Sequence, residues 1–156
     1  MTNLGELNGP VLVFGGPYSN SQATQAVLKQ ARDRGIRAAN VICTGDVVAY
    51  CADPQATVKA IRNAGIHVVM GNCEESLGQD KEDCGCGFEE GSACDLLSVQ
   101  WFTFAQGALD ADSKTWMAEL PRQLTFKLSG RRFAVIHGGV EQIERFIFPS
   151  TPQDEK

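Results

Sequence analysis

Three polar side chains that could together hold a metal ion each follow a short apolar run of the sequence. Asp46, Asn72 and His137 supply a carboxylate oxygen, an amide oxygen and an imidazole nitrogen. If the apolar runs are strands of one open α/β sheet, their carboxyl ends meet at the edge where ligands of such sheets bind. Oxygen and nitrogen donors of this kind suit a divalent cation such as Mn, Fe or Zn. The sequence therefore predicts a divalent metal site built from these three side chains.

Two of these side chains also have a purely structural interpretation. Asp46 follows a glycine, and a Gly-Asp pair often caps the turn after a strand. His137 would equally serve as a core histidine whose ring bonds to a backbone carbonyl. The equivalent position of all three residues at strand ends favours the metal site.

The cysteines offer a second place for a metal ion. Four of the six cysteines lie in one segment, and these are Cys73, Cys84, Cys86 and Cys94. Four thiolates would suit Zn or an iron–sulfur cluster, although the segment contains no Cys-x-x-Cys pair. Alternatively, Cys73 would join the oxygen and nitrogen ligands described above and make that site softer.

The first half of the chain alternates between short apolar runs and amphipathic segments. Apolar runs that end at glycine predict buried strands, and small apolar residues at helical spacing predict helices. The predicted order is strand 11–14, helix 21–34, strand 41–44, helix 54–64 and strand 66–70. This alternation with short connections predicts a parallel βαβαβ unit.

The second half is expected to contain a long loop, two helices and a hairpin. Residues 74–94 are rich in glycine, acidic residues and cysteine and have no regular period, which predicts a long loop of the kind that often carries function. Residues 93–106 and 112–120 have helical patterns, and residues 124–128 and 132–137 predict a hairpin. The side chains expected in the core of the two helices are Leu96, Leu97, Trp101, Phe104 and Trp116.

Size and composition limit the class of protein. The chain has 156 residues, of which 43% are hydrophobic, and a net charge of −5. One ordinary core fits this length, so we expect a single domain over residues 1–156. The acidic balance argues against a nucleic-acid partner, whose binding surface would be basic. No run reaches the roughly 18 apolar residues of a membrane span, and the first ten residues lack a signal-peptide core, so we expect a cytoplasmic protein with no membrane partner.

Three motifs give the chain a resemblance to a known family. They are GDVVAY at residues 45–50, GN at residues 71–72 and HG at residues 137–138. In their order and spacing the chain resembles the calcineurin-like metallophosphoesterases, specifically their small bacterial and archaeal phosphodiesterase-like branch. The resemblance implies an α/β fold, an αββα sandwich whose N-terminal part is a parallel βαβαβ core plus a hairpin. It also implies a dinuclear metal centre and hydrolysis of phosphomonoesters or phosphodiesters by a metal-activated hydroxide.

The chain departs from the family pattern at several ligand positions. Gly16 and Tyr18 occupy the positions of the family's first Asp and His, so two ligands of one metal site are absent. Cys73 stands where the family has the His of its GNH segment, and Glu74 replaces the Asp that orients this His. The family's final motif, usually GHTH, does not occur, so we expect either a fragment or a reduced protein. By the same resemblance, the three predicted ligands belong to the other metal site.

These motifs predict a metal-dependent phosphoesterase with an altered site. Asn72 and Cys73 are expected to be catalytic, beside the reacting phosphate of a small-molecule phosphoester or a phosphoprotein. Asn20, Tyr18 and Gly138 are expected to contact this substrate. The alternative is a non-catalytic metal-binding or redox-sensing module that uses the cysteine-rich loop on a phosphoesterase scaffold. If a longer protein carries the second layer of the sandwich, this chain should expose an apolar strand edge and form a homodimer.

Overall fold

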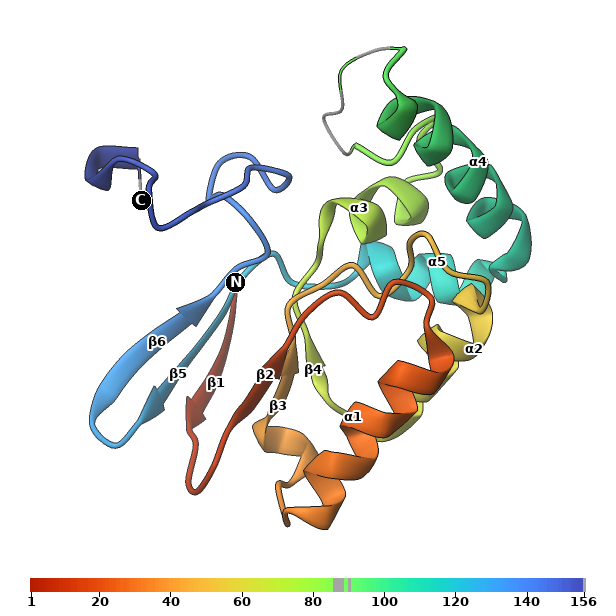
Figure 1. Cartoon of the computed structure of the whole chain (residues 1–156). Helices are drawn as coiled ribbons and strands as arrows, with labels where there is room; N and C mark the ends of the chain where they lie inside the picture. Colours follow the sequence, from red (N-terminus) through yellow and green to blue (C-terminus); the bar gives the residue numbers. More distant parts are fainter. Residues whose placement is uncertain (86–88, 90, 156) are drawn as a thin grey trace.

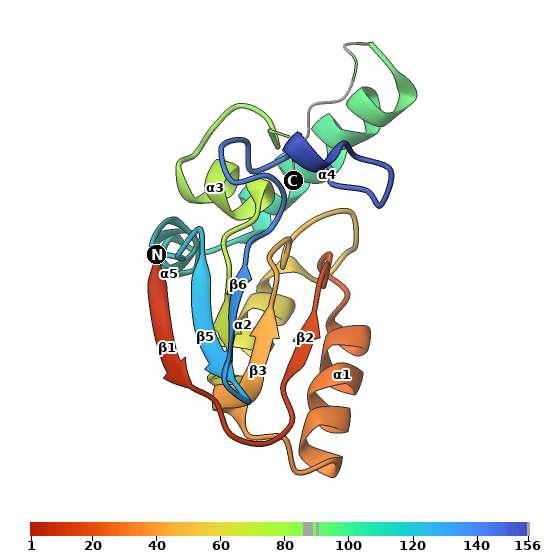
Figure 2. The same cartoon turned by 90° about the vertical axis from the view of Figure 1, so that its left-hand side faces the viewer.

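Two three-stranded sheets face each other, and helices cover the outer side of one of them (Figure 1). The computed structural model describes residues 1–85, 89 and 91–155. One sheet has the strand order β2-β3-β4, and the other has the order β1-β5-β6. Figure 2 shows the second sheet in front of the first. The expected α/β class is therefore confirmed.

The β2-β3-β4 sheet is parallel. Its strands are β2 (Leu12–Phe14), β3 (Val41–Cys43) and β4 (His67–Val68), with β3 between the other two. Helix α1 (Ser21–Asp33) connects β2 to β3, and helix α2 (Pro54–Ala64) connects β3 to β4. The predicted βαβαβ unit is confirmed by this topology.

Local signals explain where these two helices begin and end. The Asn20 side-chain oxygen accepts a hydrogen bond from the Ala23 N–H at 2.9 Å and so caps the start of α1. Pro54 occupies the first turn of α2, where its missing N–H is not needed. Gly65 ends α2 in the left-handed conformation, with a φ of 63°.

The β1-β5-β6 sheet is mixed. Strands β5 (Leu124–Leu128) and β6 (Arg131–Val135) form the predicted antiparallel hairpin. Strand β1 (Thr2–Glu6) pairs in parallel with β5 and is absent from the sequence prediction. It has Leu4 as its only apolar side chain, and as an edge strand it buries little surface, so hydrophobic periodicity gives no signal for it.

Two apolar clusters hold the layers together. Ile42 of β3 packs in one cluster with Leu124 and Phe126 of β5, which joins the inner faces of the two sheets. The opposite face of the β2-β3-β4 sheet packs on the helices through a larger cluster that includes Val58 and Phe102. The structure is therefore a sandwich with a helical layer on the β2-β3-β4 side (Figure 1).

Three further helices follow β4. They are α3 (Asn72–Gly78), α4 (Ala93–Ala108) and α5 (Ala111–Ala118). The last two are predicted helices and are confirmed, whereas α3 occupies the start of the predicted loop and corrects that prediction. Its seven residues are too few for a helical period, and its start depends on the Glu74 side chain, which accepts the Gly71 N–H at 2.9 Å. None of the described helices is long and apolar enough to cross a membrane.

The buried face of α4 differs in part from the prediction. Trp101 is buried and Trp116 packs against the same core, as expected. Leu96, Leu97 and Phe104 are instead exposed, with 60%, 61% and 52% of their surface accessible. Because apolar residues surround α4 on several sides, their periodicity does not identify the face that packs inward.

Candidate functional site

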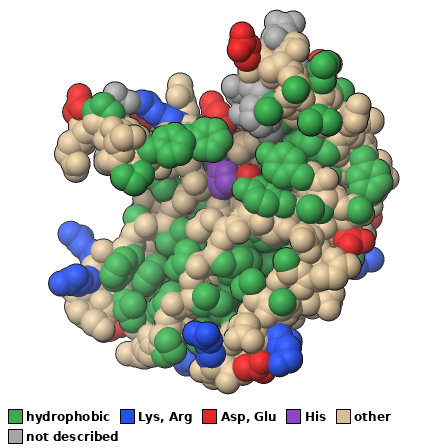
Figure 3. Space-filling model, in the orientation of Figure 1, with side chains coloured by type: hydrophobic (Ala, Val, Ile, Leu, Met, Phe, Trp, Pro, Cys, Tyr) green, Lys and Arg blue, Asp and Glu red, His purple; other side chains and the backbone are tan. Residues whose placement is uncertain are grey.

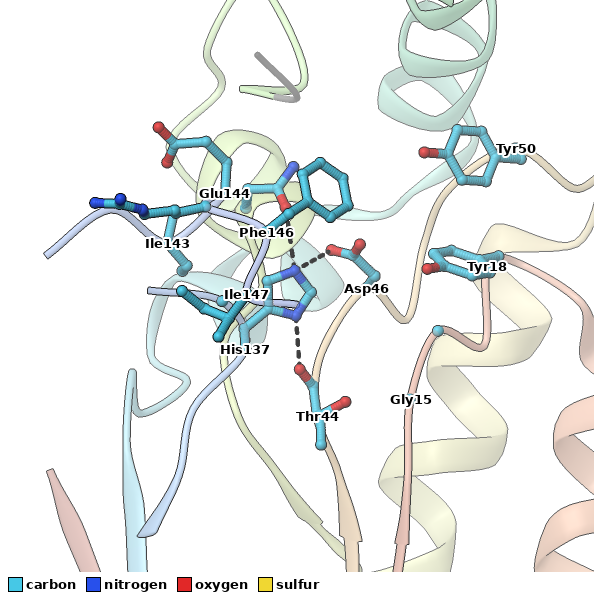
Figure 4. Close-up of a pocket in the computed structure, with 14 residues that line it drawn as sticks. Gly15, Tyr18, Thr44, Asp46, Tyr50, His137, Ile143, Glu144, Phe146 and Ile147 are labelled. Carbon is cyan, nitrogen blue, oxygen red and sulfur yellow. Dashed lines mark hydrogen bonds and ion pairs between the residues drawn. The ribbon is translucent and has the colours of Figure 1, made fainter. Parts of the chain in front are cut away.

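A cavity of about 400 Å³ lies where the segments after β2, β3 and β6 meet the start of α3. The site therefore sits beyond the carboxyl ends of the strands, as expected for this type of sheet. Figure 4 shows the side chains that line it. Its main polar side chains are Tyr18, Thr44, Asp46, Tyr50, Asn72 and His137.

The structure brings the three predicted metal ligands together. The Nε2 atom of His137 lies 3.2 Å from Oδ1 of Asn72 and 3.5 Å from Oδ1 of Asp46 (Figure 4). The three residues come from three separate segments, which follow β6, β4 and β3. These atoms are close enough to contact one ion, whose bonds to nitrogen and oxygen ligands are near 2 Å.

The hydrogen bonds of His137 determine which ring nitrogen is available. Its Nδ1 lies 2.7 Å from the Thr44 carbonyl oxygen, which can only accept, so Nδ1 donates its hydrogen. In the neutral ring, Nε2 then carries a lone pair directed at two further acceptor oxygens. Metal-binding histidines are commonly oriented in this way, by a carbonyl bonded to the other ring nitrogen.

The oxygens that face Nε2 strengthen this indication of a cation. Oδ1 of Asp46 is buried and has no hydrogen-bond partner among the described residues. The amide nitrogen of Asn72 donates to the Cys84 carbonyl oxygen at 3.1 Å, which turns the amide oxygen towards His137. A buried acceptor without a donor, such as Oδ1 of Asp46, costs free energy. A cation among these three atoms, or a proton on Nε2, removes that cost.

Glu74 fixes the position of the loop that carries Asp46. Its carboxylate is fully buried and accepts hydrogen bonds from the backbone N–H groups of Asp46, Val47 and Gly71 at 2.7, 2.8 and 2.9 Å. Burial raises the pKa of Glu74 to about 7; the negative charge of Asp46 also raises it, and the backbone donors oppose the shift. Asp46 itself has a φ of 52°, a conformation that non-glycine residues rarely adopt. The hydrogen bonds to Glu74 therefore stabilise a strained backbone at the site.

Glycines allow the segments to approach closely. A Cβ atom at Gly71 would lie 2.5 Å from Oδ1 of Asp46, and one at Gly45 would lie 2.9 Å from Nδ1 of His137. Gly45 also has a φ of 100°, which disfavours any other residue. The glycines of the GDVVAY and GN motifs thus have a steric role next to the three polar side chains.

The residues expected to contact substrate lie in different surroundings. Tyr18 and Gly138 line the cavity, whereas Asn20 caps α1 and lines a neighbouring cavity. The ring of Tyr18 lies where a side chain at Gly16 would be, since a Cβ atom there would overlap this ring. The position of a family ligand is therefore filled by an aromatic ring.

The cysteines do not converge on a shared site among the residues that the structure describes. Cys73 is buried in the core beneath the site and does not line the cavity, and burial raises its thiol pKa well above the ordinary value. Cys84 is buried and disulfide-bonded, while Cys94 is free and exposed. Cys86 lies outside the described residues. Within the described part of the chain, no group of three or more His, Cys, Asp or Glu side chains is arranged to hold a metal.

Some cavity residues are absent from the sequence prediction. Tyr50 lines the cavity beside Tyr18, and residues 143–147 form another wall. Tyr50 is the last residue of the GDVVAY motif, but the motif alone does not indicate that its side chain lines the cavity. Residues 143–147 have no regular secondary structure, and no pattern in the sequence marks them.

Comparisons with known proteins agree with this architecture. The model of the calcineurin-like phosphoesterase superfamily domain matches residues 17–154. An uncharacterised protein from Methanocaldococcus jannaschii is 25% identical over 147 residues, which are 92% of this chain and 56% of that protein. A hypothetical protein from Pyrococcus horikoshii has a similar structure, with a TM-score of 0.73 at 18% identity over 93% of this chain and 61% of the other.

A metallophosphoesterase from Sphaerobacter thermophilus also has a similar structure, with a TM-score of 0.60 at 21% identity. The match covers 88% of this chain and 51% of that chain. The present chain thus spans between half and two thirds of the length of these relatives. Because the family model matches most of its length, the chain belongs to the calcineurin-like phosphoesterase superfamily.

Proposed function

We propose that this protein is a metal-dependent phosphoesterase in which Asp46, Asn72 and His137 hold one divalent cation, Mn, Fe or Zn. The observation that carries the proposal is the meeting of three acceptor atoms, two of them 3.2 and 3.5 Å from the imidazole Nε2. A carboxylate, an amide oxygen and a neutral imidazole fit such an ion. When bound, the cation would polarise a phosphoryl oxygen and lower the pKa of water at the site.

The protein's own groups have distinct tasks in this proposal. Thr44 orients the imidazole through its carbonyl oxygen, and Glu74 holds the Asp46 loop through backbone hydrogen bonds. Asn72 serves as a ligand and a contact to the phosphoester. Cys73 receives no role in bond cleavage, because its thiol does not line the cavity and burial raises its pKa well above the ordinary value.

The substrate proposed is a phosphomonoester or phosphodiester, either a small molecule or a phosphoprotein. The family membership supports a phosphoester substrate. The cavity of about 400 Å³ is large enough for a small phosphorylated molecule.

A non-catalytic metal-binding module is the second candidate. The observation that favours it is the Tyr18 ring over Gly16, which leaves no side-chain ligand at either position of the family's other metal site. One metal would then be bound without the two-metal arrangement that stabilises both attacking and leaving oxygens.

The variant Asp46→Asn tests the metal site and the hydrolysis together. We expect its affinity for Mn²⁺, measured by calorimetry, to fall about 100-fold or more. Loss of a residue that merely hydrogen-bonds to a metal ligand already lowers metal affinity about 10–100-fold, and Asp46 is a proposed ligand itself. Hydrolysis of bis(p-nitrophenyl) phosphate and p-nitrophenyl phosphate should fall with it. Asp33→Asn is the matched control, because Asp33 is exposed on α1 and, among the described residues, its side chain pairs only with Lys29.

The two candidates predict different results for the wild-type protein. A phosphoesterase binds Mn²⁺ and hydrolyses at least one of the two phosphoesters, whereas a binding module binds Mn²⁺ and hydrolyses neither. Equal metal affinity in Asp46→Asn and wild type would contradict the proposed ligand set.

A further inference from the structure

The two tyrosines of the chain stand side by side on one wall of the cavity. The sequence contains only two tyrosines, Tyr18 after β2 and Tyr50 after β3, and both line this cavity. Their ring centroids are 5.2 Å apart. Figure 4 shows both hydroxyl groups at the inner ends of the rings, directed towards the side where Asp46 and His137 lie.

Backbone and packing contacts hold the two rings in place. The Tyr18 N–H donates to the Asp46 carbonyl oxygen at 3.0 Å, so the two cavity segments are tied together. Tyr50 packs edge to face against Trp101 of α4, with centroids 5.3 Å apart. Both tyrosines have positive φ, 49° and 40°, which costs free energy that the surrounding contacts must offset. These contacts fix a pair of phenols beside the proposed metal ligands.

The hydroxyl groups are free to act as donors. Neither hydroxyl makes a hydrogen bond to any residue that the structure describes, and the two side chains are 39% and 53% exposed. Burial, followed by the charge of Asp46, raises the pKa of Tyr18, and burial raises the pKa of Tyr50 to about 12. A phenol has an ordinary pKa of about 10, so it is neutral near pH 7 and can donate a hydrogen bond.

The chemistry of the cavity indicates what would accept these hydrogen bonds. The groups opposite the tyrosines are acceptors suited to a cation, and an anionic group bound to that cation would present oxygens to the remaining walls. A phosphoryl group has several such oxygens, and hydrogen bonds to charged acceptors are stronger than neutral ones.

We propose that Tyr18 and Tyr50 bind the phosphoryl group of the substrate by donating hydrogen bonds from both hydroxyls to its non-bridging oxygens. The inference deepens the proposed function and rests on it, because it assigns the substrate's phosphate to the wall beside Asp46. On this wall, Tyr18 stands where the family resemblance implies a histidine ligand of a second metal.

Removal of the hydroxyls alone tests this role. The double variant Tyr18→Phe/Tyr50→Phe keeps both rings and their packing. With inorganic phosphate as the probe and the Zn²⁺-loaded protein in the calorimeter, we expect the phosphate Kd to rise about tenfold for each hydroxyl removed, in the range for a hydrogen bond to a charged group. The Zn²⁺ affinity of the metal-free variant should equal that of wild type, because neither phenol is a proposed ligand.

The variant Tyr50→Leu separates hydrogen bonding from ring stacking. If the phosphate is bound through the hydroxyls, Tyr50→Phe and Tyr50→Leu weaken phosphate binding to the same degree. Full phosphate affinity in the double Phe variant would overturn the inference. A loss of affinity for an aryl phosphoester in Tyr50→Leu but not in Tyr50→Phe would also overturn it, since the ring would then stack on the substrate.

The same measurements distinguish this inference from the proposed function. If wild type hydrolyses phosphoesters and the double Phe variant has unchanged phosphate affinity and kcat/KM, the inference fails and the function stands. If wild type binds phosphate through the tyrosines but hydrolyses no phosphoester, the proposed hydrolysis fails and only the phosphate-binding role of the tyrosines remains. No detectable phosphate binding by the Zn²⁺-loaded wild type would overturn the inference.

Discussion

At the scale of single residues, the account depends on the direction of one imidazole ring. The Thr44 carbonyl accepts from Nδ1 of His137, and this contact presents Nε2 to the oxygens of Asp46 and Asn72. The structural interpretation of His137, a ring bonded to a backbone carbonyl, is therefore part of the same arrangement as the metal site. A bond to a carbonyl and a role as ligand use different nitrogens of the ring.

At the scale of elements, Glu74 links the start of α3 to the loop after β3. Its carboxylate accepts hydrogen bonds from backbone N–H groups of both segments, so one side chain connects the backbone beside Asn72 to the backbone of Asp46. We infer that ligand spacing is fixed by this link before any ion binds. Such preorganisation lowers the cost of binding.

The buried carboxyl of Glu74 predicts a pH dependence of stability. Its pKa is raised from 4.5 to about 7 in the folded protein, mainly by burial, so between these values the native state binds more protons than the unfolded state. Stability therefore falls as the pH rises through this window, by roughly 3 kcal/mol at most, at 1.36 kcal/mol for each pKa unit. Urea unfolding of the metal-free protein from pH 5 to pH 8 measures this fall.

The control for this prediction is Glu74→Gln, which cannot ionise. The variant should be less stable, because its amide group cannot accept from all the backbone donors, but its stability should change less over the same pH range. Identical pH dependence in Glu74→Gln and wild type would show that another group is responsible.

The sequence predicts those elements whose signals are local and apolar. Strand β3 and helix α2 have an apolar run and clear end signals, and both occur where expected. Strand β1 and helix α3 do not, because β1 depends on pairing with the distant β5 and α3 depends on hydrogen bonds between Glu74 and the backbone. Contacts between distant segments produce no hydrophobic periodicity in the sequence, so they cannot be recognised from it.

The candidate site follows the same rule. The meeting of Asp46 and Asn72 could be predicted because the parallel strands β3 and β4 place their carboxyl ends at one edge. His137 follows β6 of the other sheet, so the expectation of one common sheet was wrong for it, and the packing of the two sheets brings it to the site. The role of Tyr50 could not, since it depends on a φ of 40° and on packing against Trp101. The buried position of Cys73 could not be predicted from the sequence either, because it depends on the helix that starts at residue 72.

At the scale of the whole molecule, the sandwich is open along one side. Val13 of β2 and Phe133 of β6 are 47% and 41% exposed, and among the described residues β2 pairs only with β3 and β6 only with β5. Figure 3 shows hydrophobic side chains spread over the hollow between the two sheets. An apolar strand edge of this kind favours association.

The exposed apolar edge supports the expected homodimer, which stays a prediction. Light scattering after size exclusion should give a dimer for wild type and a monomer for Phe133→Lys, because a charge at the edge opposes pairing. Val140→Lys is the control, since Val140 is exposed but lies outside both sheets. A wild-type monomer at high micromolar concentration would argue against self-association through this edge.

The most direct test of the central claim is NMR of the histidine rings. The chain has two histidines, and His67 at the start of β4 serves as an internal control for His137. With ¹⁵N-labelled protein, one equivalent of Zn²⁺ should shift the Nε2 resonance of His137 while Nδ1 stays protonated, and the His67 resonances should not move. Binding of Zn²⁺ with both rings unchanged would contradict the account and direct attention to the cysteines.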